Sequence, residues 1–293
     1  MNWDDLRVFL AVARAGQILG AAKRLDLNHA TVSRRIGALE DSLGTKLFRR
    51  LTTGSELTPA GERLMVLAER MEAEAIAATA EVGGEGDAVS GTVRVGAPDG
   101  FGVAFLAPRL GALVERHPAL TVQLVPVPRS FSLSRREADI AITTERPTEG
   151  RLVAQKLVDY TLGLFAARRY AEANGLPRSA AELSAHRLVG YVPDLVINPS
   201  LDYAAEFSPD WHPRFMIASA LGQAEAIRAG AGIGIVHTFV ARSMPDLVPV
   251  EAFKPIRRAY WLVYHDSMRG LPRMRAVTDF VAGAVEAERA LFG

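Results

Sequence analysis

The sequence predicts an α+β protein of several domains, and three observations support that prediction. Residues 3–50 carry apolar positions at helical spacing, and one long helical pattern follows them. A Gly-rich stretch interrupts the pattern at residues 83–91. From residue 92 onward, apolar strands alternate with helical segments, which is typical of a mostly parallel sheet covered by helices. A chain of 293 residues can form two or three domains with separate cores.

The composition excludes several classes of protein. Hydrophobic residues at 49% and charged residues at 23% are ordinary values for a globular chain. No apolar run reaches the length of about 18 residues that a membrane span needs. The chain opens without a basic segment or an apolar segment of a secretory signal, so we expect a cytoplasmic protein. Cysteine is absent, which removes disulfides, thiolate zinc sites and thiol-based redox sensing.

The positive charge of the chain is concentrated near its start. The first 60 residues hold nine Lys and Arg against six Asp and Glu, a net charge of +3. The remainder holds 25 against 27, a net charge of −2. This asymmetry favours nucleic acid as a partner of the first segment. Two copies side by side would double the phosphate contacts, on which affinity depends steeply.

Residues 16–50 predict two helices joined by a tight turn. Apolar residues of the second helix recur at steps of four, three and four, which places them on one buried face. They are Val32, Ile36, Leu39 and Leu43. Asn28 precedes this helix as a predicted N-cap. The opposite face carries small, polar and basic side chains, which suit a helix that enters the major groove of DNA. An ordinary pair of amphipathic surface helices would show the same spacing.

A short two-stranded wing is predicted next, from Arg49 to Leu57. Its arginines and threonine hydroxyls suit phosphate contacts, although a solvated basic corner would have the same composition. We expect His29, Thr31, Ser33 and Arg34 to read base edges, with Arg34 on guanine. The full set of predicted DNA-contacting residues is His29, Ala30, Thr31, Ser33, Arg34, Arg35, Arg49, Arg50 and Thr53.

A long helix is predicted to start at Thr58-Pro59, because a capping hydroxyl precedes a proline at the first helical position. The helix runs to about Val82, and its apolar residues step close to a heptad repeat. These residues are Leu64, Leu67, Met71, Ala75, Ala78 and Val82. The seam predicts dimerisation. The alternative is a helix that packs on its own domain, and the flexible linker at residues 83–91 makes that alternative weaker.

The remaining elements are predicted from the change of period after residue 92. Strands are expected at residues 92–97, 120–127, 138–144, 152–158, 160–167, 187–192, 214–218, 233–237 and 259–265. Helices are expected at residues 101–117, 219–230 and 272–290. The order of elements repeats once, which indicates two α/β subdomains without a repeat in the sequence itself.

Ligands of open α/β sheets bind beyond the carboxyl ends of the strands and at helix N-termini. Reading those positions gives a predicted ligand site of Asp99, Phe101, Arg129, Ser130, Thr143, Tyr191, Ser219, Ala220 and His237. Ser219 and Arg129 suit a carboxylate, whereas Asp99 favours a cationic or hydroxylated ligand. The charge of the ligand therefore stays open, and each residue could instead be a cap or a loop residue.

No catalytic or metal-binding pattern is present in the sequence. The glycines of residues 230–234 end a helix and enter a strand, whereas a dinucleotide-binding loop follows a strand and opens a helix. The six histidines lack metal spacing. We therefore expect neither an enzyme nor a bound cofactor or metal.

Residues 3–61 resemble the DNA-binding domain of LysR-type transcriptional regulators. The resemblance rests on Ala21-Ala22, Val32-Ser33-Arg34-Arg35-Ile36, Leu39-Glu40, Leu43-Gly44, Leu47-Phe48-Arg49-Arg50 and Leu57-Thr58-Pro59-Ala60-Gly61. The sequence departs from the family pattern at Leu19, where a small hydroxyl residue is usual, and at His29-Ala30.

The resemblance implies a winged helix-turn-helix domain at residues 1–58, a dimerisation helix at 59–82, a hinge at 83–91 and an effector domain at 92–293. The effector domain would have the two-lobed α/β fold of type 2 periplasmic binding proteins, with crossovers near residues 160 and 266. The lobes would comprise residues 92–160 with 267–293, and residues 161–266.

The same resemblance implies a homodimer that assembles to a tetramer on double-stranded DNA. It also implies a small-molecule effector between the lobes and recruitment of RNA polymerase. Two alternatives stay open from the sequence. One is a DNA-binding regulator that responds to no effector, and the other is a cytoplasmic small-molecule-binding protein.

Overall fold

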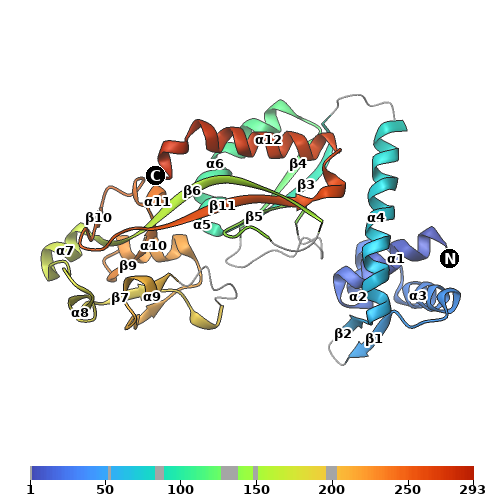
Figure 1. Cartoon of the computed structure of the whole chain (residues 1–293), viewed down its shortest axis with the longest axis horizontal. Helices are drawn as coiled ribbons and strands as arrows, with labels where there is room; N and C mark the ends of the chain where they lie inside the picture. The colour runs from blue at the N-terminus through green and yellow to red at the C-terminus, as the bar shows by residue number, and fades with distance from the viewer. Residues whose placement is uncertain (1, 52–53, 83–88, 127–137, 148–150, 196–202) are drawn as a thin grey trace. The chain divides into compact units, whose positions relative to one another are not determined.

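The computed structural model describes residues 2–51, 54–82, 89–126, 138–147, 151–195 and 203–293 (Figure 1). The chain divides into two compact units, made mainly of residues 1–87 and residues 88–293. The division falls inside the predicted hinge, most of which lies outside the described residues. Within the described part of the chain, no helix is both long and apolar enough to cross a membrane.

The first unit begins with three helices whose ends are set by their own sequence. They are α1 (Trp3–Ala15), α2 (Ile18–Leu25) and α3 (His29–Leu43). The Asn28 side chain accepts a hydrogen bond of 2.7 Å from the backbone N–H of Thr31, which confirms the predicted N-cap of α3. Gly44 ends the same helix with φ of 63°, a conformation that glycine adopts without steric cost.

The predicted wing and the predicted long helix are both present. Strands β1 (Phe48–Leu51) and β2 (Gly54–Leu57) pair antiparallel. The backbone N–H of Ser55 donates to the carbonyl of Gly16 at 2.7 Å, which ties the wing to the turn between α1 and α2. Helix α4 (Pro59–Val82) has 24 residues.

The start of α4 belongs to the first unit, because its first turns pack against the core of that unit. Ala68 is fully buried in this core, and Leu64 and Met65 pack against it. Gly61 lies so close to the wing that an added Cβ would stand 2.2 Å from the carbonyl oxygen of Leu47. Leu64, predicted on the dimer seam, therefore contacts its own domain.

Glu72 fixes α4 to α1 further along the helix. The Arg14 guanidinium donates to both carboxylate oxygens of Glu72, at 3.2 and 2.7 Å. The two side chains are only 6% and 18% exposed. Two parallel hydrogen bonds of this kind fix the orientation of the two side chains as well as their separation, whereas a single contact fixes only the separation.

Within the described ranges, the second unit is built on a nine-stranded sheet with the order β4-β3-β5-β11-β6-β9-β7-β8, and β10 pairs with β6. The strands are β3 (Gly91–Ala97), β4 (Leu120–Pro126), β5 (Ile140–Thr143), β6 (Leu152–Ala167), β7 (Leu188–Gly190), β8 (Phe215–Met216), β9 (Ile233–His237), β10 (Leu247–Pro249) and β11 (Ile256–His265). The β3–β4, β3–β5, β7–β8 and β7–β9 pairs are parallel. The pairs made by β6 and β11 are antiparallel.

Strands β6 and β11 run through the whole unit, between β3–β5 at one end and β7 and β9 at the other (Figure 1). The sequence predicted two strands, at 152–158 and 160–167, where the structure has one strand of 16 residues. The strand continues through Asp159, whose carboxylate forms an ion pair of 2.7 Å with Lys156 at the surface. The predicted return crossover near residue 266 corresponds to β11, which pairs with β6 and also with β5.

Helices cover this sheet. They are α5 (Asp99–Phe101), α6 (Ala107–Arg116), α7 (Arg168–Asn174), α8 (Ala180–Leu183), α9 (Ala204–Phe207), α10 (Ala220–Arg228), α11 (Thr238–Ala241) and α12 (Pro272–Ala287). A π-helical turn, η1 (Gly102–Leu106), joins α5 to α6, and short 3-10 turns lie at Pro193–Leu195, Asp266–Met268 and Arg289–Leu291. Helix α12 packs against β3, β6 and α6.

Candidate DNA-binding surface and ligand site

Helix α3 has one buried face and one free face. Val32 and Leu39 are 0% exposed and Ile36 is 7% exposed, as the spacing predicts. Leu43 was expected on the same face but is 39% exposed, because it lies in the last turn, where the helix ends at Gly44. On the other face, Arg34 is exposed and makes no side-chain hydrogen bond or ion pair within the described part of the chain.

The other residues of α3 that were predicted to contact DNA differ in their exposure and in their partners. His29 and Ala30 are exposed, and Thr31 and Ser33 are half-buried. Arg35 instead faces α1, where its guanidinium lies 3.4 Å from the carboxylate of Asp4 and 3.9 Å from that of Asp5. This geometry gives Arg35 a structural role that the sequence did not predict.

The wing shows a similar internal pairing. The Arg49 guanidinium donates to the Glu56 carboxylate across the two strands at 2.7 Å. Both side chains are exposed, so this ion pair is worth little and a phosphate could replace the carboxylate. Arg50 lies in β1, and Thr53 lies outside the described residues. Lys23 and Arg24, in the last turn of α2, are exposed cations that the sequence reading did not include.

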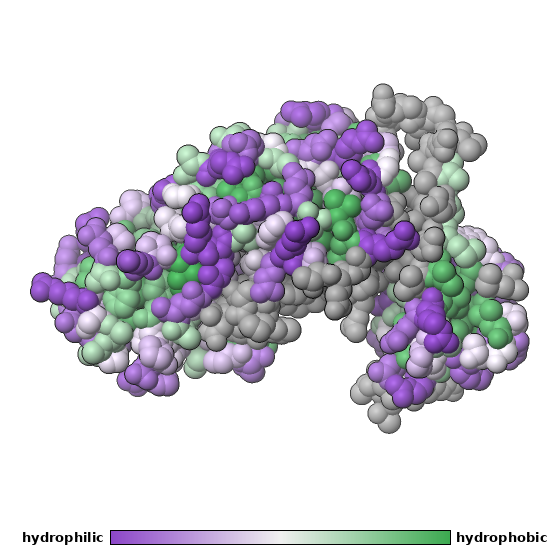
Figure 2. All heavy atoms as spheres, viewed as in Figure 1, coloured by the Kyte–Doolittle hydropathy of each residue, from purple (hydrophilic) through white to green (hydrophobic). Residues whose placement is uncertain are grey.

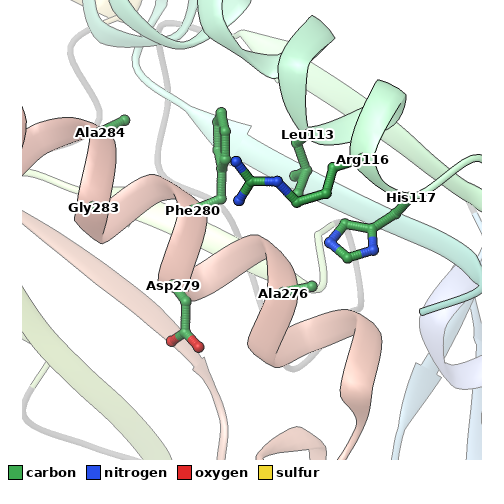
Figure 3. A pocket seen from close by; sticks show the side chains of 8 residues that line it. All are labelled: Leu113, Arg116, His117, Ala276, Asp279, Phe280, Gly283 and Ala284. Carbon is green, nitrogen blue, oxygen red and sulfur yellow. The ribbon is translucent and has the colours of Figure 1, made fainter. Parts of the chain in front are cut away.

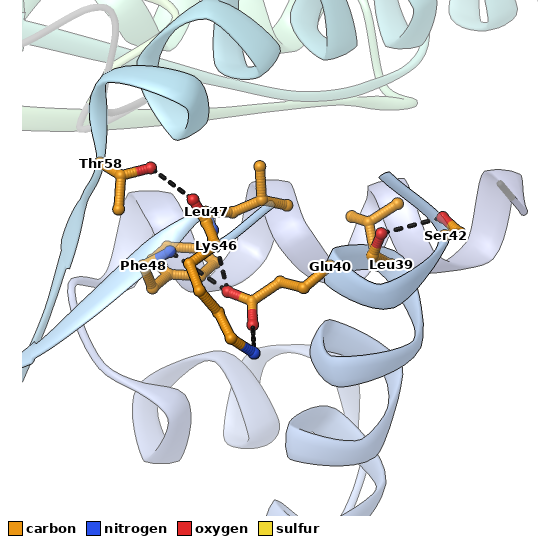
Figure 4. A network of polar contacts seen from close by, with 7 residues as sticks. All are labelled: Leu39, Glu40, Ser42, Lys46, Leu47, Phe48 and Thr58. Carbon is orange, nitrogen blue, oxygen red and sulfur yellow. Dashed lines mark hydrogen bonds and ion pairs between the residues drawn. The ribbon is translucent and has the colours of Figure 1, made fainter. Parts of the chain in front are cut away.

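A buried carboxylate joins α3 to the wing (Figure 4). Glu40 is 7% exposed and accepts hydrogen bonds from the backbone N–H groups of Leu47 at 2.9 Å and Phe48 at 3.4 Å. The ammonium group of Lys46 lies 2.6 Å from its other oxygen. Burial raises the pKa of Glu40, but the Lys46 bond and the two backbone donors outweigh it and hold that pKa below its usual value.

Replacing Glu40 with alanine is expected to lower the free energy of unfolding by about 1–3 kcal/mol at pH 7, because two backbone donors lose their acceptor. A carboxylate with a depressed pKa in the folded state stabilises the fold above its unfolded pKa. That contribution disappears as the pH falls through the pKa of the folded state. When the pH is lowered from 7 to below about 4.3, the parent should therefore lose more free energy of unfolding than the alanine variant does.

Urea unfolding at pH 7 and at acidic pH measures both effects. Asp41→Ala is the matched control, because Asp41 is exposed and its carboxylate makes no hydrogen bond with a described residue. Its cost should stay within about 0.5 kcal/mol. An equal cost for both variants would contradict the assigned role of Glu40.

In the α/β unit, the structure brings Asp99 and Ser219 together. The Ser219 hydroxyl donates to Oδ2 of Asp99 at 2.6 Å, and the backbone N–H of Leu221 approaches the same oxygen at 3.4 Å. Ser219 is the N-cap of α10, where its hydroxyl oxygen accepts from the backbone N–H of Gly222 at 3.0 Å. Ala220 begins that helix, and its Cβ lies 3.6 Å from the position a Cβ on Gly100 would take.

His237 lies at the same place. It ends β9, is 9% exposed and stacks on Tyr160 at a centroid distance of 5.4 Å. Its ring atoms Cε1 and Nδ1 lie 3.1 and 3.3 Å from the Cβ position of Gly100. Burial lowers the pKa of His237 to about 4, against the opposing charge of Asp99, so the imidazole is neutral at neutral pH.

The other predicted ligand residues divide into four groups. Tyr191 is half-buried, and burial together with the charge of Asp99 raises its pKa to about 12. Phe101 is fully buried and packs on Tyr260 at 4.6 Å, so it is a core residue. Thr143 uses its hydroxyl within its own loop, donating to the carbonyl of Glu145 at 2.7 Å. Arg129 and Ser130 lie outside the described residues.

Three tyrosines complete this cluster, and the sequence reading missed all of them. Tyr160 and Tyr260 stack at 4.0 Å on the two long strands, and the hydroxyl of Tyr203 lies 3.3 Å from that of Tyr160. The guanidinium of Arg258 lies 5.5 Å from the centre of the Tyr203 ring and forms an ion pair with Glu206. Tyr160 pairs with Arg258 and Tyr260 with Val158 in the strand register, so the two rings meet diagonally across the strands, which no local pattern in the sequence indicates.

A separate hollow of about 420 Å³ lies between α6 and α12 (Figure 3). Its lining is Leu113, Arg116, His117, Ala276, Asp279, Phe280, Gly283 and Ala284. Arg116 extends toward the ring of Phe280, and Asp279 points away from both (Figure 3). The face of the α/β unit seen in Figure 2 is mostly hydrophilic, with scattered hydrophobic areas. This hollow contains none of the predicted ligand residues.

The fold and these sites define a class of protein, a helix-turn-helix DNA-binding protein joined to an α/β substrate-binding domain. The family described as bacterial regulatory helix-turn-helix proteins of the lysR family matches residues 3–62. The LysR substrate binding domain matches residues 86–286. The chain therefore belongs to the LysR family and is a DNA-binding transcriptional regulator.

Known relatives agree along almost the whole chain. The Mau operon transcriptional activator of Paracoccus denitrificans is 29% identical, and the alignment covers 96% of each chain. The regulator CrgA of Neisseria meningitidis is 27% identical, again over 96% of each chain. The structure of CrgA matches with a TM-score of 0.59 at 25% identity, over 97% of this chain and 98% of that one. Full-length OxyR from Pseudomonas aeruginosa shares the fold, with a TM-score of 0.72 at 20% identity, over 98% and 95%.

Proposed function

We propose that the protein acts in the cytoplasm as a homodimer, further assembled to a tetramer, and catalyses no reaction. Paired copies of α3 would enter successive major grooves of a nearly palindromic operator. The observation that carries this proposal is the polar face of α3, on which the Arg34 guanidinium is exposed and unpaired among the described residues.

Control by an effector is the second part of the proposal. A small molecule would bind where Asp99, at the end of β3, meets Ser219, at the start of α10. These residues belong to the two halves that β6 and β11 connect. A ligand with different affinity for two arrangements of the halves would shift the population of the assembly, and so its contact with DNA and RNA polymerase.

Replacing Arg34 with alanine tests the DNA-binding surface. If Arg34 donates to a guanine, the variant should lose about 1–3 kcal/mol of preference for the operator over random DNA, a factor of about 5–150. Binding of the full chain to fragments from upstream of its own gene, at several salt concentrations, measures that preference.

Arg7→Ala is the matched control. It removes one positive charge from the same unit, but Arg7 lies on α1, where its guanidinium is 3.8 Å from Asp4. We expect this variant to keep the preference for the operator. Equal losses in both variants would mean that α3 contributes charge alone. No preference of the parent for any fragment would refute the proposed use of α3.

A further inference from the structure

The anion-binding end of α10 is already occupied by a carboxylate of the chain itself. Helix N-termini attract anions, because their first N–H groups lack partners within the helix. At α10, the Ser219 hydroxyl and the Leu221 N–H both point to Oδ2 of Asp99, at 2.6 and 3.4 Å. A carboxylate ligand would have to displace Asp99 from both donors.

Asp99 itself has no positive partner among the residues that the structure describes. It is half-buried, and it makes no ion pair with any residue in the described ranges. Its second oxygen, Oδ1, likewise accepts no hydrogen bond there. A carboxylate in this position can therefore pair with a positively charged group of a ligand.

One buried polar group beside Asp99 has no partner within the described part of the chain, and a histidine lies next to it. The imidazole of His237 is 9% exposed, lies against Gly100, and makes no hydrogen bond with a described residue. The hydroxyl of Tyr260 is fully buried and has no partner in bonding geometry among the described residues. A buried polar group is seldom left unpaired, so the Tyr260 hydroxyl indicates a ligand with a hydrogen-bonding group of its own.

The charges around the tyrosines are mainly negative. Burial is the main cause of the raised pKa values of these tyrosines. Asp99, Glu145 and Glu206 raise some of these pKa values further, and Arg258 is the one described cation that lowers any of them. Arg258 already lies over the Tyr203 ring at 5.5 Å, so the cluster can hold a guanidinium against an aromatic face. Among the described groups, three are negative and one is positive, and the positive one, Arg258, is already paired with Glu206. These described charges suit a second cation.

We propose that Asp99 makes this site select an organic cation, an amine or a guanidinium compound, and reject free carboxylates. The inference rests on the proposed effector site between the two halves of the α/β unit. The ammonium or guanidinium group pairs with Asp99, and a further polar group of the ligand meets His237 or Tyr260. The alternative is that Asp99 serves only as a cap that holds α10 in place.

Matched pairs of small molecules distinguish these readings on the full-length chain. Putrescine and succinate share a four-carbon skeleton, and tyramine and 3-(4-hydroxyphenyl)propionate share a phenol. Thermal unfolding and titration calorimetry with each compound, and with the guanidinium ion at low concentration, give the preference directly. We expect binding by amines or guanidinium and none by the carboxylates.

Three variants assign that preference to Asp99. Asp99→Asn keeps the shape and removes the charge, and should weaken amine binding by about 10-fold or more. Asp99→Glu keeps the charge and should still prefer amines over carboxylates. Ser219→Ala removes the competing donor, so it should retain or strengthen amine binding.

Some outcomes overturn the inference. They are carboxylate binding by the parent without amine binding, failure of every amine and guanidinium probe, or amine binding that Asp99→Asn leaves unchanged. A different result concerns the proposed function instead. If an amine binds through Asp99 but leaves the DNA complex of the same protein unchanged, the selectivity stands and the effector role fails.

Discussion

Replacing Phe292 with alanine is expected to lower the free energy of unfolding of the α/β unit by about 3–5 kcal/mol. Phe292 is 0% exposed, and its ring contacts three others, at centroid distances of 4.9 Å to Phe105, 5.0 Å to Phe239 and 6.0 Å to Phe101. The substitution would leave a cavity between aromatic rings from the first and last parts of the unit. These rings are packed against one another and have little freedom to move into the cavity. Urea unfolding measures the loss.

Two controls separate this effect from a general sensitivity of the unit. Phe292→Leu keeps most of the apolar volume and should cost much less than the alanine variant. Val114→Ala shortens a side chain that is 39% exposed on α6, and should stay within about 0.5 kcal/mol. The assigned role of Phe292 fails if its alanine variant is no less stable than the Val114 variant.

Replacing both Leu67 and Met71 with glutamine is expected to weaken operator binding by about 100-fold or more. These side chains are 52% and 43% exposed on α4, although both are large and apolar. If a second copy covers them, polar substitutes would separate the dimer. Each monomer would then bind its half-site alone, without the high effective concentration that linkage gives.

Sedimentation and DNA binding on the same samples test this prediction. Glu62→Ala, at an exposed position in the first turn of the same helix, should leave both the dimer and its affinity unchanged. A double variant that stays dimeric and binds the operator as the parent does would exclude Leu67 and Met71 from the interface.

The first unit could be predicted almost completely, because its signals are local. Asn28 and Gly44 mark the ends of α3 within a few residues of the side chains they organise. The same holds for Thr58-Pro59 at the start of α4. Capping and i, i+4 spacing act within one helix, so one sequence is enough to read them. The partner of Arg35 on α1 could not be predicted, because it depends on how two helices cross.

In the α/β unit, local sequence patterns do not predict which residues come together. Asp99 and Ser219 were each found at a strand or helix end, but their hydrogen bond joins residues 120 positions apart. Local periodicity carries no information on a contact between residues so far apart in the sequence. Phe101 was misread for the same reason, since its position at a strand end suggested a ligand contact while its packing on Tyr260 depends on β11.

The fork between Arg14 and Glu72 has a mechanical consequence. Together with the close approach of Gly61 to Leu47, it fastens α4 to the helix-turn-helix domain at two points. Two points of attachment restrain the rotation of α4 relative to this domain. We therefore expect a rotation of α4 about its own axis to rotate α3 together with it. If two copies of the chain bind one operator, adjustment to a different half-site spacing would have to arise outside the contact of α4 with its own domain.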